Sequence, residues 1–66
     1  MIIEINGERR ELDRSRVLAD AIRDWGYEGQ PIAVAYNDEF VPRGRYAAIQ
    51  LRDGDRLEIV APMQGG

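Results

Sequence analysis

The sequence predicts an α+β domain in which one main helix covers one face of a β-sheet. A strand-like stretch with a hairpin turn spans residues 2–12, and a segment with helical apolar spacing follows at 15–25. Two further stretches with strand character, 32–41 and 56–61, complete the pattern. A hairpin, a single helix and then further strands favour a helix that lies on one face of the sheet.

A β-hairpin is expected over residues 2–12. Ile3 and Ile5 alternate with other residues, so they fall on one face of a strand. The Asn6-Gly7 pair that follows suits a type I′ turn, in which both central residues take positive φ. The dipeptide therefore predicts that the first two strands pair across it.

The helix is expected to be capped by the hydroxyl of Ser15 and to end at Gly26. Its apolar residues follow the i, i+3, i+4, i+7 spacing of one buried face: Leu18, Ala21, Ile22 and Trp25. The other side carries charged residues that are expected to face solvent: Asp20, Arg23 and Asp24. This pattern predicts a helix with one buried and one solvated face.

A third strand is expected over residues 32–36, which follow a Gly-Gln-Pro break at 29–31. Residues 37–39 are expected to form a turn, and 40–41 a short strand. A proline and a glycine within 42–46 stop this strand, so a loop is expected there.

The last strand is expected over residues 56–61, where outward and inward positions alternate as in a half-buried strand. The preceding Asp53-Gly54-Asp55 favours a turn, because aspartate and glycine adopt turn conformations that other residues resist. The two carboxylates could in principle hold a hard cation, but their place between two apolar runs favours the turn. Pro62 cannot donate to a sheet ladder, so the strand is expected to stop before it.

A length of 66 residues allows one domain, expected at 1–61, followed by a flexible tail at 62–66. Such a domain buries only about 60% of the surface of its unfolded chain, so its core is small. No cysteine is present to add a disulfide or a thiolate metal site. No apolar run approaches the roughly 20 residues that span a bilayer, so a cytoplasmic protein without a membrane partner is expected.

The residue inventory argues against independent catalysis. The chain has no histidine, cysteine, lysine or threonine and a single serine, Ser15, so triads built on histidine are impossible. No glycine-rich phosphate loop is present, and no intrinsic cofactor or metal is expected. The net charge of −3 disfavours nucleic acid as a partner. All nine cationic residues are arginine, which codon bias explains. A protein whose terminal carboxyl group is activated would also benefit, because it has no side-chain amine that this group could acylate.

The sequence closes on Gly65-Gly66, in a stretch of five residues that reaches roughly 17 Å when extended. A frayed terminus is the ordinary explanation. The functional alternative is that two residues without Cβ atoms let the backbone enter a narrow channel of a partner enzyme. The Gly66 carboxylate is unreactive until an enzyme adenylates it, after which a sulfur nucleophile can displace AMP and leave a thiocarboxylate.

Two stretches resemble the ThiS family, the sulfur carriers of thiamine thiazole synthesis: AVAYNDEFVPRGRY at 33–46 and LRDGDRLEIVAPMQGG at 51–66. The specific pieces are AVAYN, VPR, the DGD turn and the Gly-Gly end. Tyr46 stands where the family usually has tryptophan, and Ser15 where it often has threonine. The resemblance implies a ubiquitin-like β-grasp fold with a mixed sheet of four to five strands and a flexible tail.

The resemblance also implies a protein co-substrate rather than an enzyme. A ThiF-type, E1-like enzyme would use ATP to adenylate Gly66, and a cysteine desulfurase or another donor would supply sulfur. A ThiG-type thiazole synthase would receive it. Gly65 and Gly66 carry over as the functional motif, and no catalytic residue within the fold does. Val60 and Met63, apolar residues beside the tail, are the candidate docking residues.

Four alternatives stay open, and one of them is a sulfur carrier for another pathway. The small subunit of molybdopterin synthase resembles this chain in fold, DGD turn and Gly-Gly end, whereas the VPR segment favours the thiazole family. A protein modifier that forms amide bonds with target lysines would begin from the same adenylate. A plain β-grasp interaction module with an inert tail would keep its activity after removal of Gly65 and Gly66.

Overall fold

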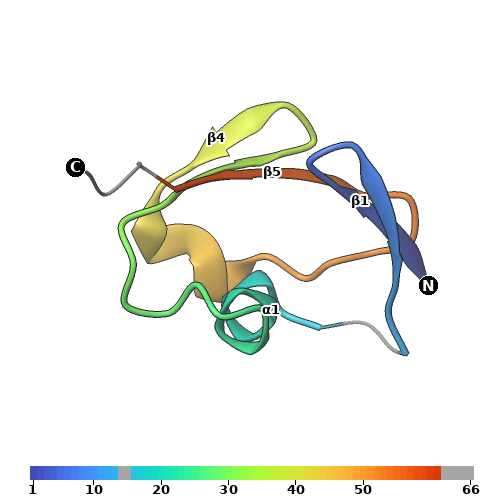
Figure 1. Cartoon of the computed structure of the whole chain (residues 1–66), viewed down its shortest axis with the longest axis horizontal. Coiled ribbons are helices and arrows are strands. Elements are labelled where there is room, and N and C mark those ends of the chain that lie inside the picture. Colours follow the sequence, from blue (N-terminus) through green and yellow to red (C-terminus); the bar gives the residue numbers. More distant parts are fainter. Residues whose placement is uncertain (14–15, 62–66) are drawn as a thin grey trace.

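The computed structural model describes residues 1–13 and 16–61, which form a five-stranded mixed sheet with the helices on one side of it (Figure 1). The strand order is β2-β1-β5-β3-β4, and β1 runs parallel to β5 while the other neighbours are antiparallel. The elements in chain order are β1 (Ile2–Ile5), β2 (Glu8–Glu11), α1 (Leu18–Asp24), β3 (Ala33–Tyr36), β4 (Glu39–Val41), η1 (Arg43–Ala48) and β5 (Arg56–Val60). The predicted α+β arrangement is confirmed.

Both hairpins turn through residues with positive φ. Asn6 and Gly7 have φ values of 51° and 82° between β1 and β2, as the predicted type I′ turn requires. Asn37 and Asp38 have φ values of 49° and 72° between β3 and β4. Asparagine and aspartate adopt positive φ more readily than other residues with a Cβ. Asn6, Asn37 and Asp38 therefore favour turns at these places in the chain.

The start of α1 differs from the expectation. Val17, not Ser15, is the N-cap residue, and it makes no capping hydrogen bond through its side chain. Ser15 itself lies outside the described residues. Instead the chain is pinned here by pairing with a distant segment: the Leu18 N–H donates to the carbonyl of Ile49 over 2.8 Å. A tertiary backbone hydrogen bond therefore meets the first residue of this helix.

The end of α1 follows the sequence. Gly26 has φ 89° and its N–H donates to the carbonyl of Arg23, while the Tyr27 N–H donates to the carbonyl of Ile22, each over 3.1 Å. This pair of bonds is a Schellman motif, and glycine suits its left-handed position. Gly26 ends the helix as predicted.

The segment expected to be a loop after Pro42 is instead the 3₁₀-helix η1, which lies beside α1. None of its residues is fully buried, so the segment carries no apolar periodicity that a sequence pattern could reveal. The predicted strands at 32–36 and 56–61 are each shorter by one residue, at the N-terminal and C-terminal end respectively. None of the helices within the described residues has the length and apolarity to cross a bilayer.

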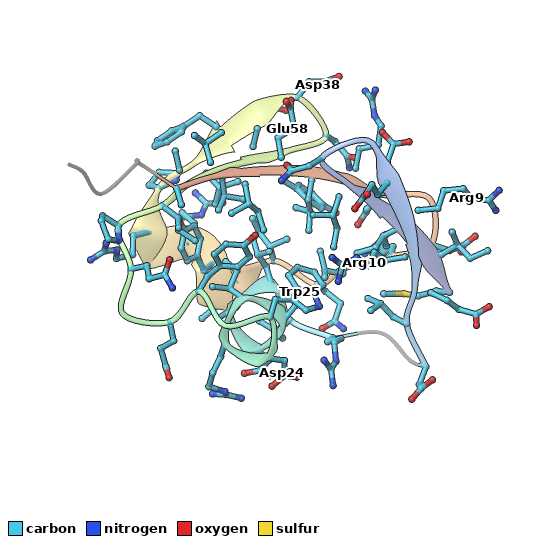
Figure 2. All side chains as sticks on the ribbon, viewed as in Figure 1. Arg9, Arg10, Asp24, Trp25, Asp38 and Glu58 are labelled. Atoms are coloured by element: carbon cyan, nitrogen blue, oxygen red, sulfur yellow. The ribbon has the colours of Figure 1, made fainter. Side chains whose placement is uncertain are left out.

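The core lies between the sheet and the helices. Its ten buried apolar residues come from β1, α1, β3, β4, β5 and the segment before the last turn: Ile3, Ile5, Leu18, Ala21, Ile22, Val34, Val41, Leu51, Leu57 and Ile59. Trp25 packs against this cluster, and Figure 2 shows it on the helix side of the sheet, whereas Asp24 points away from the sheet. Asp20, Arg23 and Asp24 are exposed, as predicted.

Candidate functional site

The candidate site is β5, the strand that leads into the last residues of the chain. It lies at the centre of the sheet, between β1 and β3. Ile5 stands opposite Leu57 on the parallel side, and Ala33 stands opposite Val60 on the antiparallel side. β1 and β3 therefore hold both edges of β5 at its start, and the ladder with β3 continues alone to Val60.

The side chain of Asn6 continues the hydrogen bonding between β1 and β5 beyond the last residue of β1. Its Nδ2 donates to the carbonyl of Ile59 over 3.1 Å, and its Oδ1 accepts from the Ile59 N–H over 2.8 Å. The side-chain amide thereby takes the place of one more pair of backbone groups. A single residue thus turns the first hairpin and anchors a strand 53 positions away.

Asn37 has the same role at the start of β5. Its Oδ1 accepts from the Arg56 N–H and its own N–H donates to the Arg56 carbonyl, each over 2.8 Å. Asn37 also turns the second hairpin. Two turn asparagines, one from each hairpin, therefore hold the two ends of β5.

A buried carboxylate completes this support. Asp55 is only 8% exposed and accepts three hydrogen bonds, from the Tyr36 hydroxyl at 2.7 Å, the Arg52 N–H at 2.8 Å and the Asn37 Nδ2 at 3.2 Å. Burial, followed by the hydrogen bond to Asp55, raises the pKa of Tyr36 above its ordinary value of 10.0. The satisfied carboxylate ties β3 and the segment before the last turn to the residue that precedes β5.

The Asp53-Gly54-Asp55 turn is confirmed. Asp53 Oδ1 accepts from the Ile2 N–H over 2.7 Å, and the Gly54 N–H donates to the Ile2 carbonyl over 2.8 Å. Gly54 takes φ 89°, which few other residues tolerate. Both carboxylates therefore accept hydrogen bonds from the protein itself, and residues 1–13 and 16–61 hold no group of three or more potential metal ligands.

The predicted site residues are described only in part. Val60 is the last residue of β5 and is 61% exposed, on the sheet face away from the helices. Met63, Gly65 and Gly66 lie outside the described residues. The structure therefore shows the fixed strand that presents the tail, and Gly66 as the reactive group stays a prediction.

Phe40 is an exposed apolar residue that the sequence analysis placed in a short strand without a role. It is 71% exposed, more than any other large apolar residue among those described. The sequence does not single it out, because an apolar residue in a short strand can equally belong to the core. Its outward direction follows from the structure, since its neighbour Val41 is buried and successive residues of a strand face opposite sides.

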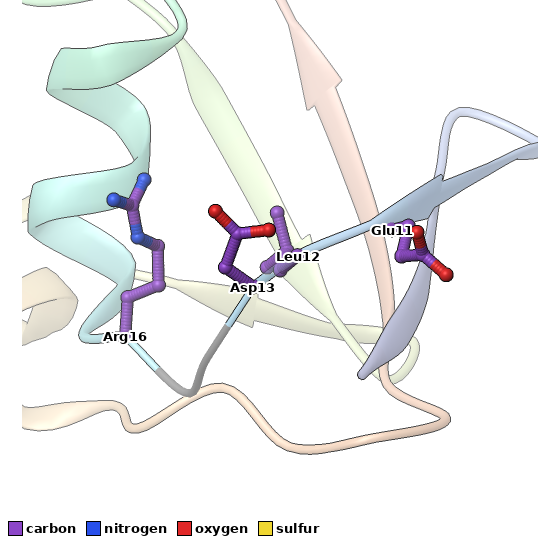
Figure 3. Close-up of a pocket in the computed structure, with 4 residues that line it drawn as sticks. All are labelled: Glu11, Leu12, Asp13 and Arg16. Atoms are coloured by element: carbon purple, nitrogen blue, oxygen red, sulfur yellow. The ribbon is translucent and has the colours of Figure 1, made fainter.

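A polar hollow lies at the other end of the sheet from Val60. It has a volume of about 450 Å³ and is lined by Glu11, Leu12, Asp13 and Arg16 (Figure 3). Its walls are mainly polar, and Arg16 is already paired with Asp24 of α1. Among the residues that the structure describes, the lining of this hollow therefore offers no apolar seat for a substrate.

Comparisons with known proteins agree on one family. The sequence matches the model of the ThiS family over residues 3–66, a range that includes both terminal glycines. It is 37% identical to the sulfur carrier protein ThiS of Thermus thermophilus, over 98% of this chain and all of that protein. A crystal structure of the thiamine biosynthesis protein ThiS from Geobacter metallireducens superposes with a TM-score of 0.84 at 25% identity, with full coverage of both chains. The predicted ubiquitin-like β-grasp is thereby confirmed.

Two longer relatives contain a stretch similar to the whole of this chain. The thiazole synthase of Paramagnetospirillum magneticum is 39% identical over all 66 residues, and that of Magnetococcus marinus is 32% identical over the same length. The chain spans about a fifth of the length of each of these two proteins.

Proposed function

The chain belongs to the ThiS family of sulfur carrier proteins, and from this membership we propose that it carries sulfur for thiazole formation in thiamine biosynthesis. The observation that carries the proposal is the family match over residues 3–66, which includes Gly65 and Gly66. The fold supports it, because β5 is fixed from both sides and leads directly toward that motif. The chain acts as a protein co-substrate of its partner enzymes, not as a catalyst.

The reactive group is the carboxylate of Gly66. An E1-like, ThiF-type enzyme binds ATP, and the carboxylate attacks its α-phosphorus, so that the bond to the β-phosphate breaks, pyrophosphate leaves and the acyl adenylate remains. The sulfur of a hydrosulfide then adds to the carbonyl carbon, and AMP departs with the oxygen it was bonded to. Where the donor is a persulfide, its attack gives an acyl disulfide, and a second thiol cleaves the S–S bond, which releases the thiocarboxylate and leaves a disulfide on the donor. The product is a thiocarboxylate, and the side chains of the carrier take no part in either step.

The proposed partners follow from the same chemistry. The ThiF-type enzyme activates the chain, a cysteine desulfurase or another donor supplies sulfur, and a ThiG-type thiazole synthase receives it. The similarity of the whole chain to part of two thiazole synthases supports the last of these partners. Val60 and Met63 are the proposed docking residues beside the tail, and the cytoplasm is the proposed compartment.

The proposal is tested by the intact mass of the chain after incubation with the matched activating enzyme, ATP and a sulfur donor. We expect the mass change for replacement of one oxygen by sulfur, located by fragmentation in the peptide that contains Gly66. A variant without Gly65 and Gly66 is the control and should stay unmodified while it melts at the same temperature.

Two results would contradict the carrier function. Persistent absence of the sulfur-containing mass with active partner enzymes would exclude it. Conjugates in which the chain is joined to lysine side chains of other proteins would favour a protein modifier. If the thiocarboxylate forms but only molybdopterin synthase, and not thiazole synthase, consumes its sulfur, the chain serves that pathway instead.

A further inference from the structure

One whole face of the sheet is uncovered by any described element. α1 and η1 lie on the opposite side, as Figure 1 shows. Because successive strand residues face opposite sides, each buried position identifies its neighbours as outward-facing. The outward residues of the three strands nearest the second hairpin are Ala33 and Ala35 of β3, Phe40 of β4, and Arg56, Glu58 and Val60 of β5.

Four of these residues form one apolar patch. Val60 stands opposite Ala33, and Phe40 stands opposite Ala35, which follows Ala33 on the same face of β3. We call Ala33, Ala35, Phe40 and Val60 the outer patch. The two alanines leave a low strip between the large side chains, of which Phe40 is 71% and Val60 61% exposed. An exposed phenylalanine in such a setting gains by burial against another protein.

An acidic hollow adjoins the outer patch and shares Ala35 with it. The hollow has a volume of about 320 Å³ and lies between the two hairpin turns. Its charged walls are Glu4, Asp38, Arg56 and Glu58. Figure 2 shows Asp38 and Glu58 together on the sheet side away from α1.

The charges of the hollow are only partly compensated. Arg56 pairs with Asp38, and Glu4 stands opposite both Arg56 and Arg9. Glu58 forms no ion pair within the described residues. It stands directly opposite Ala35 of the outer patch. The hollow therefore has room and negative charge for the end of one long cationic side chain.

We propose that the outer patch and the acidic hollow form one docking surface, whose occupant is a partner protein that presents an apolar side chain beside an arginine or lysine. The apolar side chain lies between Phe40 and Val60, and the cation enters the hollow next to Glu58. This inference rests on the proposed function, because Val60 ends β5 and a protein seated there is positioned to receive the following residues.

The test measures the dissociation constant of the chain with the purified ThiF-type enzyme and, separately, the ThiG-type enzyme, by calorimetry without ATP. Phe40→Ser, Val60→Ser and Glu58→Arg are the test variants. Ile2→Ser is a matched control, because Ile2 is an exposed apolar residue on the same face but at the other end of the sheet. Glu11→Arg on the edge strand β2 makes the same charge change as Glu58→Arg, since each moves the net charge from −3 to −1.

We expect each test variant to weaken binding of at least one enzyme by about tenfold or more, as truncation of a central interface residue does. The effect of Glu58→Arg should decrease with added salt, whereas that of Phe40→Ser should not. The controls should bind as the unchanged chain does. All five positions are exposed, so each variant is expected to fold, and its melting temperature checks this. If Phe40→Ser does not fold, the binding of Val60→Ser and Glu58→Arg tests the docking surface.

Unchanged binding of both enzymes by the three test variants would overturn the docking surface, as would equal weakening by the controls. A chain that dimerises in solution and becomes monomeric in Phe40→Ser would show that a second copy occupies the patch instead. The thiocarboxylate assay keeps the two proposals distinguishable. If the thiocarboxylate forms while the variants bind normally, the carrier function stands and the docking surface does not. If the variants lose binding but the unchanged chain forms no thiocarboxylate, the docking surface stands and the carrier function does not.

Discussion

Replacement of Asp55 by alanine tests whether the buried carboxylate supports the strand that presents the tail. The change removes the acceptor of three hydrogen bonds, from Tyr36, Arg52 and Asn37, at a position that is 8% exposed. A hydrogen bond to a charged group contributes about 1.5–3 kcal/mol. At the low end three such bonds would contribute about 4.5 kcal/mol. Because the donors of half-buried Tyr36 and exposed Asn37 regain water in the variant, the expected loss in unfolding free energy is smaller, about 3 kcal/mol.

This loss is large for so small a domain. At about 0.05–0.15 kcal/mol per residue, a chain of 66 residues has an unfolding free energy of roughly 3–10 kcal/mol. Asp55→Ala is therefore expected to approach the limit of folding at room temperature. Asp55→Asn keeps one acceptor oxygen and should lose less, about 1–2 kcal/mol.

The assay is urea denaturation followed through the fluorescence of Trp25, the single tryptophan, which packs against the core. Asp53→Ala is the matched control. It removes a neighbouring carboxylate that accepts one exposed hydrogen bond, from the Ile2 N–H, and should lose about 1 kcal/mol or less. If Asp55→Ala loses no more stability than Asp53→Ala, the buried network does not hold β5 in the way that its geometry indicates.

Three further outcomes are expected. Asn6→Ala loses both hydrogen bonds to Ile59 and places alanine at φ 51°, so the unfolding free energy should fall by about 2 kcal/mol in the same urea assay. If the unfolding free energy falls no more than it does in Glu8→Ala, Asn6 does not anchor β5. Because the pKa of Tyr36 is raised in the folded state, its neutral form stabilises the fold at pH values below about 10, and this stability is lost as the pH rises through the folded-state pKa. The melting temperature should therefore fall less above pH 10 in Tyr36→Phe than in the unchanged chain. Equal falls in melting temperature would refute this role of Tyr36. Arg43 follows Val41 by two residues, and Val41 and Ile59 both stand opposite Val34, so Arg43→Lys places an amine near the end of β5. Incubation with the activating enzyme and ATP without a sulfur donor should then yield a self-conjugate lighter by one water, whereas Arg9→Lys on the edge strand β2 should not.

The sequence predicts those elements of the fold that short-range rules control. Asn6-Gly7 indicates the first hairpin because both positions need positive φ, and Gly26 indicates the helix end for the same reason. The alternation in 56–61 correctly places Leu57 and Ile59 inside, but its third inward position, Ala61, is exposed because β5 ends at Val60. The 3₁₀-helix η1 escapes prediction, because none of its residues is fully buried and no apolar period marks it.

The candidate site divides in the same way. The sequence points to Val60 as an exposed residue beside the tail, and the structure agrees. It does not reveal that Phe40 lies on the same face, because their proximity depends on the pairing of β5 with β3 and of β3 with β4. Nor does it distinguish the roles of Asp53 and Asp55, since only packing decides which carboxylate of the turn is buried.

By itself, the sequence determined the order and type of most elements, ruled out a triad built on histidine, and indicated the family through AVAYN, VPR, the DGD turn and the Gly-Gly end taken together. These properties depend on residue identity or on neighbours a few positions apart. Tertiary structure alone decided the strand order with β5 at its centre, the start of α1 at Leu18, the anchoring of Ile59 by Asn6 and the outer patch. Each of these joins residues far apart in the chain, and such contacts form only when the helices and the sheet bury one shared core.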